Sequence, residues 1–200
     1  MKLKKKEISE YIQKFLKEDK INKDITSKYF INNKQKARAI FLTEGELVLA
    51  GNIIVLNIFK KKCRSFKLLF KLNDGTKIKK KKKVLVLEGN AQDILSLERT
   101  VLNILQHLSG ISTLTSKFCE QIKDSNTILL DTRKTTPGLR VLEKYATYIG
   151  GAKNHRLNLA ERFMIKDNHL IMNSKIFTKI KKMKERKKRN LIIECDTLLQ

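Results

Sequence analysis

The chain has 200 residues, of which 41% are hydrophobic, and its formal net charge at pH 7 is +24. That hydrophobic share can bury a real core, which excludes a disordered chain, and no apolar run approaches the ~18 residues of a membrane span. Cys63, Cys119 and Cys195 are odd in number and widely spaced, which favours neither a disulfide framework nor a zinc site. The basic first residues are not followed by the apolar segment of a signal peptide, so we expect a cytoplasmic protein.

The first ninety or so residues have the pattern of an α+β unit. Residues 7–16 place apolar side chains at helical spacing and predict an amphipathic helix. Residues 53–59 fit either a helix or a strand, and Asn73-Asp74-Gly75 predicts a turn. Residues 37–42 alternate like a half-buried strand and 46–50 are expected to form another, while 66–70 and 84–88 predict strands of an antiparallel sheet.

The pattern changes near Ala91. A helix is expected over 97–108, with a break at Ser109-Gly110, and the helical spacing resumes over 111–122. Short apolar runs then alternate with amphipathic helices, which predicts a parallel sheet with right-handed crossovers, either open or closed into a barrel. The expected strands are 127–130, 162–165 and 191–195, and the expected helices are 139–149 and 175–188.

The positive charge is concentrated in two runs. Lys60 to Lys83 holds twelve Lys or Arg against one Asp, and Lys175 to Arg189 holds nine against one Glu. We interpret both runs as solvated faces of a lysine-rich chain, with contact to polyanions as the alternative.

Arginine follows a different distribution. Five of the nine arginines lie between Arg99 and Lys166, where only six lysines occur. A guanidinium can donate two parallel hydrogen bonds to one carboxylate or phosphate, which an ammonium cannot do. This region is therefore the expected site for an anion with several charges.

Charged residues also follow each expected strand of the second half. Arg133 and Lys134 come after the first strand, Lys166 and Asp167 after the second, and Glu194 ends the third. Because chemistry gathers at the carboxyl ends of parallel strands, these side chains are expected to share one rim.

Each of these residues also has an ordinary structural interpretation. Arg133 and Lys134 could merely pair with Asp131, as surface ions do for little energy. For Lys166 the available carboxylates are those of Asp167 and Glu161.

The remaining residues of interest are open in the same way. His155 and His169 could be ordinary loop or core histidines, and Arg99 a solvated residue at the start of its helix. Glu194 stands among apolar residues, and a buried carboxylate needs a partner, for which one of the lysines named above is expected.

Four consecutive segments resemble the signatures of the quinolinate phosphoribosyltransferase family, also called nicotinate-nucleotide pyrophosphorylases (carboxylating). The segments are ERTVLNILQHLSGISTLT from Glu98, DTRKTTPGLRVLEKYA from Asp131, GGAKNHRLNL from Gly150 and FMIKDNHL from Phe163. The likeness extends more weakly through KDITS at residues 23–27.

The resemblance implies an α/β fold class. It divides the chain into an N-terminal α/β sandwich over residues 1–97 and, over 98–200, the first part of an α/β barrel of the type II phosphoribosyltransferase kind. Family members continue through further strands, so the resemblance also implies a truncated form. A homodimer with sites at the subunit interface is expected.

The implied reaction joins quinolinate to phosphoribosyl pyrophosphate and releases pyrophosphate and carbon dioxide, giving nicotinate mononucleotide for NAD synthesis. Mg²⁺ is expected on the pyrophosphate, with no metal held by the protein itself. Arg99 would reach into the partner's site to help bind quinolinate. The two carboxylates would be held by Arg133, His155, Arg156 and Lys166.

The family motif also assigns the remaining roles. Lys134 and Thr135 would meet substrate beside the carboxylates, and Glu194 would face the ribose, where it could stabilise positive charge developing at the anomeric carbon. The expected catalytic residues are Glu194, Lys134 and Lys166. A same-fold phosphoribosyltransferase without decarboxylation is the nearer alternative. A basic nucleic-acid-binding module is the distant one, and membrane partners are not expected.

Overall fold

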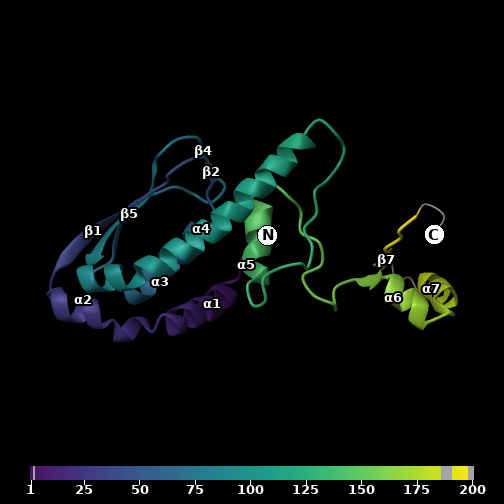
Figure 1. The fold of residues 1–200 in the computed structure, drawn as a ribbon, viewed down its shortest axis with the longest axis horizontal. Helices are drawn as coiled ribbons and strands as arrows, with labels where there is room; N and C mark the ends of the chain where they lie inside the picture. Colours follow the sequence, from purple (N-terminus) through teal and green to yellow (C-terminus); the bar gives the residue numbers. More distant parts are fainter. Residues whose placement is uncertain (2, 186–190, 198–200) are drawn as a thin grey trace. The chain divides into compact units, whose positions relative to one another are not determined.

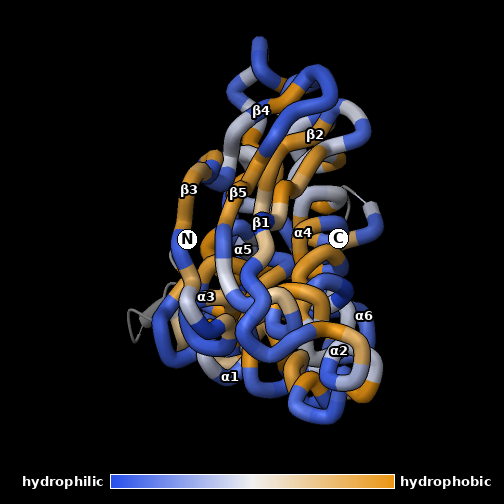
Figure 2. Tube along the Cα trace, turned by 90° about the vertical axis from the view of Figure 1, so that its left-hand side faces the viewer, coloured by the Kyte–Doolittle hydropathy of each residue, from blue (hydrophilic) through white to orange (hydrophobic). Residues whose placement is uncertain are grey.

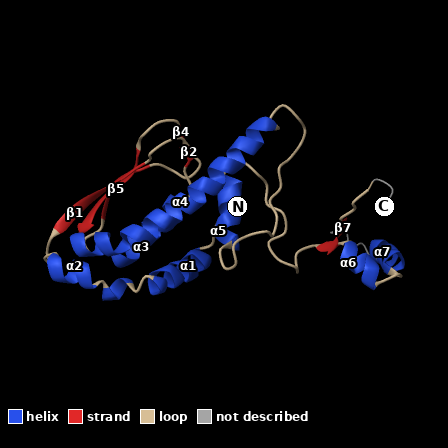
Figure 3. Cartoon of the chain, viewed as in Figure 1, coloured by secondary structure: helices blue, strands red, loops and turns tan. Residues whose placement is uncertain are grey.

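The computed structural model describes residues 1, 3–185 and 191–197, and the chain divides into two units, Met1–His155 and Arg156–Gln200. Helices and strands of both units are drawn in Figures 1 and 3. The first unit contains α1 (Lys5–Glu18), the 3-10 turn η1 (Ile21–Lys23), α2 (Ile25–Phe30), β1 (Lys36–Leu42), β2 (Leu47–Val48), α3 (Asn52–Lys62), β3 (Lys67–Lys71), β4 (Lys77–Ile78), β5 (Lys83–Asn90), α4 (Ala91–Gln121) and α5 (Arg140–Ile149). The second unit contains β6 (Phe163–Ile165), α6 (Asp167–Met172), α7 (Ile176–Glu185) and β7 (Leu191–Ile193).

The first unit is built on an antiparallel sheet in the order β1-β5-β3, with β2 and β4 forming a separate antiparallel pair. All four segments predicted to be strands contain one, so the predicted antiparallel sheet is confirmed; β4 was not predicted. Strand β1 alternates as a half-buried strand should, with Phe41 turned into the core and Arg38 turned outward to an ion pair with Glu88.

Helix α3 lies at the centre of the core of the first unit. Residues 53–59, which fit either helix or strand, are helical, and Ile54, Val55, Ile58 and Phe59 are fully buried. Such a helix is apolar around most of its circumference, so it lacks the one-sided period that would have identified it. Figure 2 shows hydrophobic residues along β3, β5 and α4, and hydrophilic residues in the turns between strands.

Helix α1 confirms the amphipathic helix predicted over residues 7–16. Its buried residues Ile8, Ile12 and Leu16 follow helical spacing and join the core. The two short helices α2 and α6 were not predicted, because six residues are too few to show a period.

Helix α4 runs without interruption through Ser109 and Gly110, so the break predicted there is wrong. The hydroxyl of Ser109 donates to the backbone oxygen of Ala50 and accepts from the amide of Ala50, and the hydroxyl of Ser112 donates to Val48. These small polar residues let α4 approach the chain around β2 closely and form hydrogen bonds with the backbone groups of that chain segment. This tertiary pairing outweighs the ~1 kcal/mol that glycine costs in a helix.

The buried strand predicted over residues 127–130 is also wrong in this structure. Only Leu130 makes a strand-like contact, a single parallel bridge to Lys153, and Leu130 is half exposed. An apolar run becomes a strand only where a neighbour offers backbone groups along its length, and here Lys153 alone bonds to Leu129 and Asp131.

The second unit contains a parallel strand pair, as expected for its alternating pattern. Strand β6 pairs with β7 from Phe163↔Leu191 to Ile165↔Ile193. Helix α7 confirms the predicted helix as far as Glu185; residues 186–188 of that prediction, and the end of the second basic run, lie outside the described residues.

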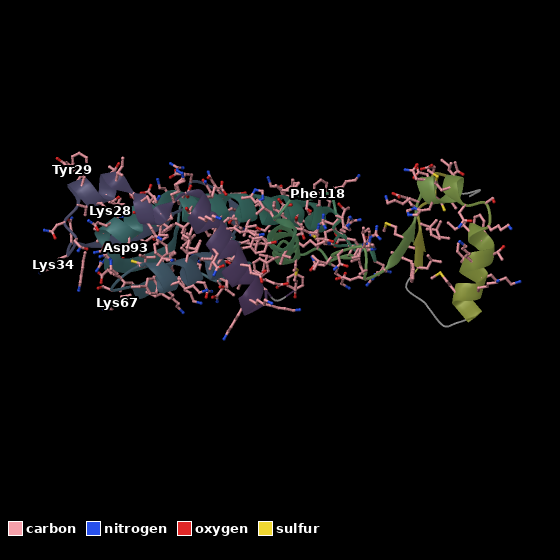
Figure 4. The ribbon with its side chains drawn as sticks, turned by 90° about the horizontal axis from the view of Figure 1, so that it is seen from below. Lys28, Tyr29, Lys34, Lys67, Asp93 and Phe118 are labelled. Atoms are coloured by element: carbon pink, nitrogen blue, oxygen red, sulfur yellow. The ribbon has the colours of Figure 1, made fainter. Side chains whose placement is uncertain are left out.

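The basic run from Lys60 to Lys83 is exposed at every lysine and arginine, as a solvated face should be. Figure 4 shows Lys34 and Lys67 at the outer edge of the first unit. No helix among the described residues is long and apolar enough to cross a membrane. The domain boundary predicted between residues 97 and 98 falls within α4 and stays a prediction.

Candidate functional site

The loop between the Leu130 bridge and α5 carries three of the expected site residues, Arg133, Lys134 and Thr135. It is a tight turn, in which the amide of Lys134 donates to the hydroxyl of Thr132 and that of Thr135 donates to the carbonyl of Arg133. Gly138 takes a φ of +83°, which lets the loop reverse into α5. The loop is therefore held by its own backbone, leaving the long side chains of Arg133 and Lys134 available.

Asp131 at the start of this loop does not pair with Arg133 or Lys134, so that interpretation is wrong. Its carboxylate forms an ion pair with the Nζ of Lys144, and the two side chains are 4% and 2% exposed. The amide of His155 also donates to Asp131, over 2.8 Å. The ion pair is thus a buried link between the loop, α5 and the segment that ends at His155.

Arg133 is half-buried, and its Nε is buried without a hydrogen-bond partner. Lys134 is exposed. Within the described part of the chain, no carboxylate lies at ion-pair distance from either residue. A half-buried guanidinium with an unsatisfied donor is suited to binding an anionic ligand.

A second carboxylate anchors the same loop from α5. One oxygen of Glu143 accepts from the amide of Thr136 over 3.0 Å, and the other lies 2.9 Å from Nε2 of His107 on α4. Burial alone would raise the pKa of Glu143, but the hydrogen bonds from Thr136 and His107 outweigh it, so the pKa lies below its usual value. Glu143 is therefore an ionised anchor.

In the second unit, the two parallel strands bring Lys166 and Glu194 together. Each residue directly follows its strand, and their Nζ and Oε2 atoms lie 2.6 Å apart. A lysine partner for Glu194 is therefore confirmed, and Lys166 does not take Asp167 or Glu161 instead. The expected burial of Glu194 is wrong, because its side chain is 56% exposed. Apolar neighbours on a strand bury a residue only where another layer covers that face.

Arg156 and His169 have local roles in the second unit. Arg156 is buried, donates to the carbonyl of Arg162 over 3.2 Å and lies 3.3 Å from the sulfur of Met164. The Nδ1 of His169 accepts from the amide of Lys166 over 3.1 Å, which is a helix-capping role for an exposed histidine. His169 therefore has an ordinary structural role.

Arg99 is exposed on α4, about two turns after the start of the helix at Ala91, so the first-turn position expected for it is wrong. It lines a groove of about 580 Å³ between α4 and the chain from Phe41 to Leu47. The other side chains of α4 in this groove include Leu102, Gln106 and Leu114.

The structure thus brings Arg133, Lys134, Thr135 and His155 into one region of the first unit, and Lys166 with Glu194 into one region of the second. Sequence reasoning missed Lys144, Glu143 and His107, because charged residues within an amphipathic helix give no sign of burial. No group of three or more His, Cys, Asp or Glu side chains suited to a metal ion occurs in the described part of the chain.

The half-buried Arg133 and the exposed Lys134, in a loop of a mixed α/β fold, are suited to binding an anionic ligand. Two family models match the chain. The model described as "Quinolinate phosphoribosyl transferase, N-terminal domain" matches residues 24–109, and the model described as "Quinolinate phosphoribosyl transferase, C-terminal domain" matches residues 111–200. The chain belongs to the quinolinate phosphoribosyltransferase family, and its α/β fold class is confirmed.

The chain is also similar to curated relatives and to solved structures. A Nicotiana glauca quinolinate phosphoribosyltransferase [decarboxylating] 2, mitochondrial, is 40% identical over 165 residues, which is 82% of this chain and 46% of the relative. A probable nicotinate-nucleotide pyrophosphorylase [carboxylating] of Synechocystis is 35% identical, over 95% of this chain and 64% of the relative. NadC from Streptococcus pyogenes has a TM-score of 0.91 at 30% identity, over 100% of this chain and 71% of the NadC chain. The chain spans about half to two thirds of the length of these curated relatives.

Proposed function

We propose that the protein transfers a phosphoribosyl group from phosphoribosyl pyrophosphate to quinolinate, with loss of carbon dioxide, to form nicotinate mononucleotide for NAD synthesis. The observation that carries the proposal is family membership combined with the free cationic side chains of Arg133 and Lys134. Mg²⁺ would enter bound to the pyrophosphate substrate. The enzyme is proposed to act in the cytoplasm, where its free cysteines would stay reduced.

Charge is the physical basis for substrate recognition. Quinolinate carries two carboxylates, and clustered cations repel one another until such a dianion neutralises them. At an effective dielectric near 20, one cation–carboxylate pair at about 4 Å contributes roughly 4 kcal/mol before desolvation is subtracted. We assign this role to Arg133, His155, Arg156 and Lys166, with Lys134 and Thr135 beside them.

The exposed Lys166–Glu194 pair fits a further part of the proposal. An ion pair between side chains that are 43% and 56% exposed adds little stability, so a substrate carboxylate can replace Glu194 as the partner of Lys166. Glu194 would then face the ribose and stabilise the positive charge that develops as pyrophosphate leaves the anomeric carbon. Lys134 and Lys166 complete the proposed catalytic set.

Decarboxylation of quinolinate depends on the positive charge that the first step creates on its ring. Once the pyridine nitrogen has bonded to the ribose it is cationic, and its positive charge stabilises the electron pair that stays on the adjacent ring carbon when the 2-carboxylate departs as carbon dioxide. That carbon then takes a proton. Excluding water from the carboxylate favours this step, because water would stabilise its charge.

The decisive test is a calorimetric titration of quinolinate into the wild type and Arg133→Ala. We expect binding by the wild type and its loss in Arg133→Ala. Arg38→Ala is the matched control, because it removes an arginine from an exposed pair with Glu88 and should bind as the wild type does. Saturation at a hundred times the dissociation constant should also stabilise the wild type against unfolding by ~2.7 kcal/mol. Equal binding by wild type and Arg133→Ala would contradict the assignment.

Product analysis separates decarboxylation from simple transfer. Incubation with quinolinate, phosphoribosyl pyrophosphate and Mg²⁺ should yield nicotinate mononucleotide by mass spectrometry. A product heavier by one carbon dioxide would instead indicate a same-fold transferase that does not decarboxylate.

Assembly is part of the proposal: we infer a homodimer in which Arg99 of one subunit completes the partner's site. A mixture of Arg99→Ala and Arg133→Ala chains tests it. Random pairing gives half of the dimers one intact site, so activity should recover to about one quarter of the wild type. If each variant is inactive and the mixture stays inactive, Arg99 acts within its own subunit.

A further inference from the structure

Asp131 lies two and three residues before the two cations expected to bind substrate, yet it is paired with neither. Its partner is Lys144, ten residues further along the chain than Lys134, in the second turn of α5. The ion pair is buried, whereas Lys134 is exposed. Lys144 therefore occupies the position beside the Asp131 carboxylate to which Arg133 or Lys134 would otherwise be attracted.

The carboxylate of Asp131 is fully occupied. Oδ1 accepts from Lys144 Nζ and from the amide of His155 over 2.8 Å. Oδ2 accepts from Nδ2 of Asn154 over 2.6 Å and from the hydroxyl of Thr147 over 3.4 Å. A carboxylate offers about four lone-pair positions, so no acceptor capacity remains for Arg133 or Lys134.

We propose that Lys144 is a positioning residue that acts as the internal counter-ion of Asp131 and so keeps Arg133 and Lys134 free for the substrate anion. The inference rests on the proposed function, because it concerns the same binding residues. A buried carboxylate that loses its counter-ion is strongly unfavourable. The flexible side chains of Arg133 and Lys134 are the nearest cations along the chain, so without Lys144 at least one would turn toward Asp131.

A merely structural ion pair and a counter-ion with this role make different predictions. If the pair only stabilises the fold, removing either charge should have similar effects on ligand affinity. If Lys144 keeps Asp131 away from the binding cations, only removal of the lysine should weaken anion binding. Removing the aspartate leaves no carboxylate to capture Arg133 or Lys134.

The test compares Lys144→Met, Asp131→Asn and the double variant with the wild type, each as the full chain, by calorimetric titration with quinolinate. Methionine keeps the length of the lysine stem, and asparagine keeps an oxygen that can accept from the His155 amide. We expect Lys144→Met to bind at least tenfold more weakly than the wild type. Asp131→Asn and the double variant should bind within threefold of it.

A second measurement needs no ligand. Acetylation of Lys134 and modification of Arg133 by phenylglyoxal are followed by peptide mass spectrometry in all four proteins. At least one of the two residues should react at least threefold more slowly in Lys144→Met, because pairing with Asp131 shields it, and should recover in the double variant. If Lys144→Met does not fold, the double variant alone tests the proposal. The counter-ion role requires the double variant to bind quinolinate, and its Arg133 and Lys134 to react with the labelling reagents, as in the wild type.

Three results would overturn the inference: equal loss of affinity in both single variants, a double variant as weak as Lys144→Met, or unchanged reactivity of both Arg133 and Lys134. A wild type that does not bind quinolinate, but whose labelling responds to Lys144→Met as described, would instead contradict the proposed function and leave the counter-ion role in place.

Discussion

Replacing Gly150 by alanine should weaken the contact between α5 and α4. A Cβ at this position would lie 2.5 Å from the backbone oxygen of Ser112 and 2.6 Å from the Cβ of Thr115, both on α4. The backbone of Gly150 has a φ of −71°, which alanine adopts freely, so the effect is steric. Overpacking of this kind costs roughly 1–3 kcal/mol, and the reduced entropy of the unfolded chain returns about 0.4–1 kcal/mol. We expect a net loss of about 1–2 kcal/mol.

Gly110→Ala is the matched control on the same helix, with the opposite expected sign. Nothing lies within 4 Å of a Cβ at Gly110, and the residue is exposed in the middle of α4. Alanine should therefore stabilise the helix by roughly 0.8–1 kcal/mol. Urea unfolding followed by circular dichroism measures both changes. A stable Gly150→Ala variant would refute the close packing of α5 on α4, and a destabilised Gly110→Ala variant would refute the continuous helix.

Two further predictions concern the first unit. Hydrogen bonds from Ser27 and Ser96 lower the pKa of Asp24 to about 2, below its unfolded value near 3.9, so the stability it contributes is present above about pH 4 and lost as the pH falls through 2. Because Asp24 is partly exposed, Asp24→Asn should lower the free energy of unfolding by only about 1 kcal/mol at pH 7 and by almost nothing at pH 2. Urea unfolding midpoints at the two pH values measure the difference, and an equal loss at both would contradict the prediction. Phe59 is fully buried, and Phe59→Ala should lose roughly 3–5 kcal/mol, whereas Phe118, 57% exposed on α4 (Figure 4), should lose less than about 0.5 kcal/mol on the same change. Similar losses in thermal unfolding would place Phe59 outside the core.

Local periodicity was enough to predict most helices and strands, because one face of each is apolar. It failed at Ser109 and Gly110, where the local preference against helix is real but smaller than the hydrogen bonds made to the chain around Ala50. Those bonds join residues far apart in the sequence, and no local pattern contains them. The same limit applies to the pairing of β1 with β5, whose alternation was predicted but whose register depends on the whole sheet.

Predicting the partners of charged residues depended on which rule was used. Sequence proximity offered Arg133 and Lys134 as partners of Asp131, as the alternative to a substrate-binding role, and that alternative is wrong because the helix after the loop brings Lys144 to the carboxylate. Parallel-strand geometry gave Glu194 a lysine from a neighbouring strand end, and it was right for Lys166. The difference is physical: a buried carboxylate pairs with the cation that the fold desolvates beside it, and adjacency in the chain does not supply that desolvation. A basic residue beside an acid in a loop can therefore still be free to bind a ligand, provided that a second cation from a packed helix has already taken the acid.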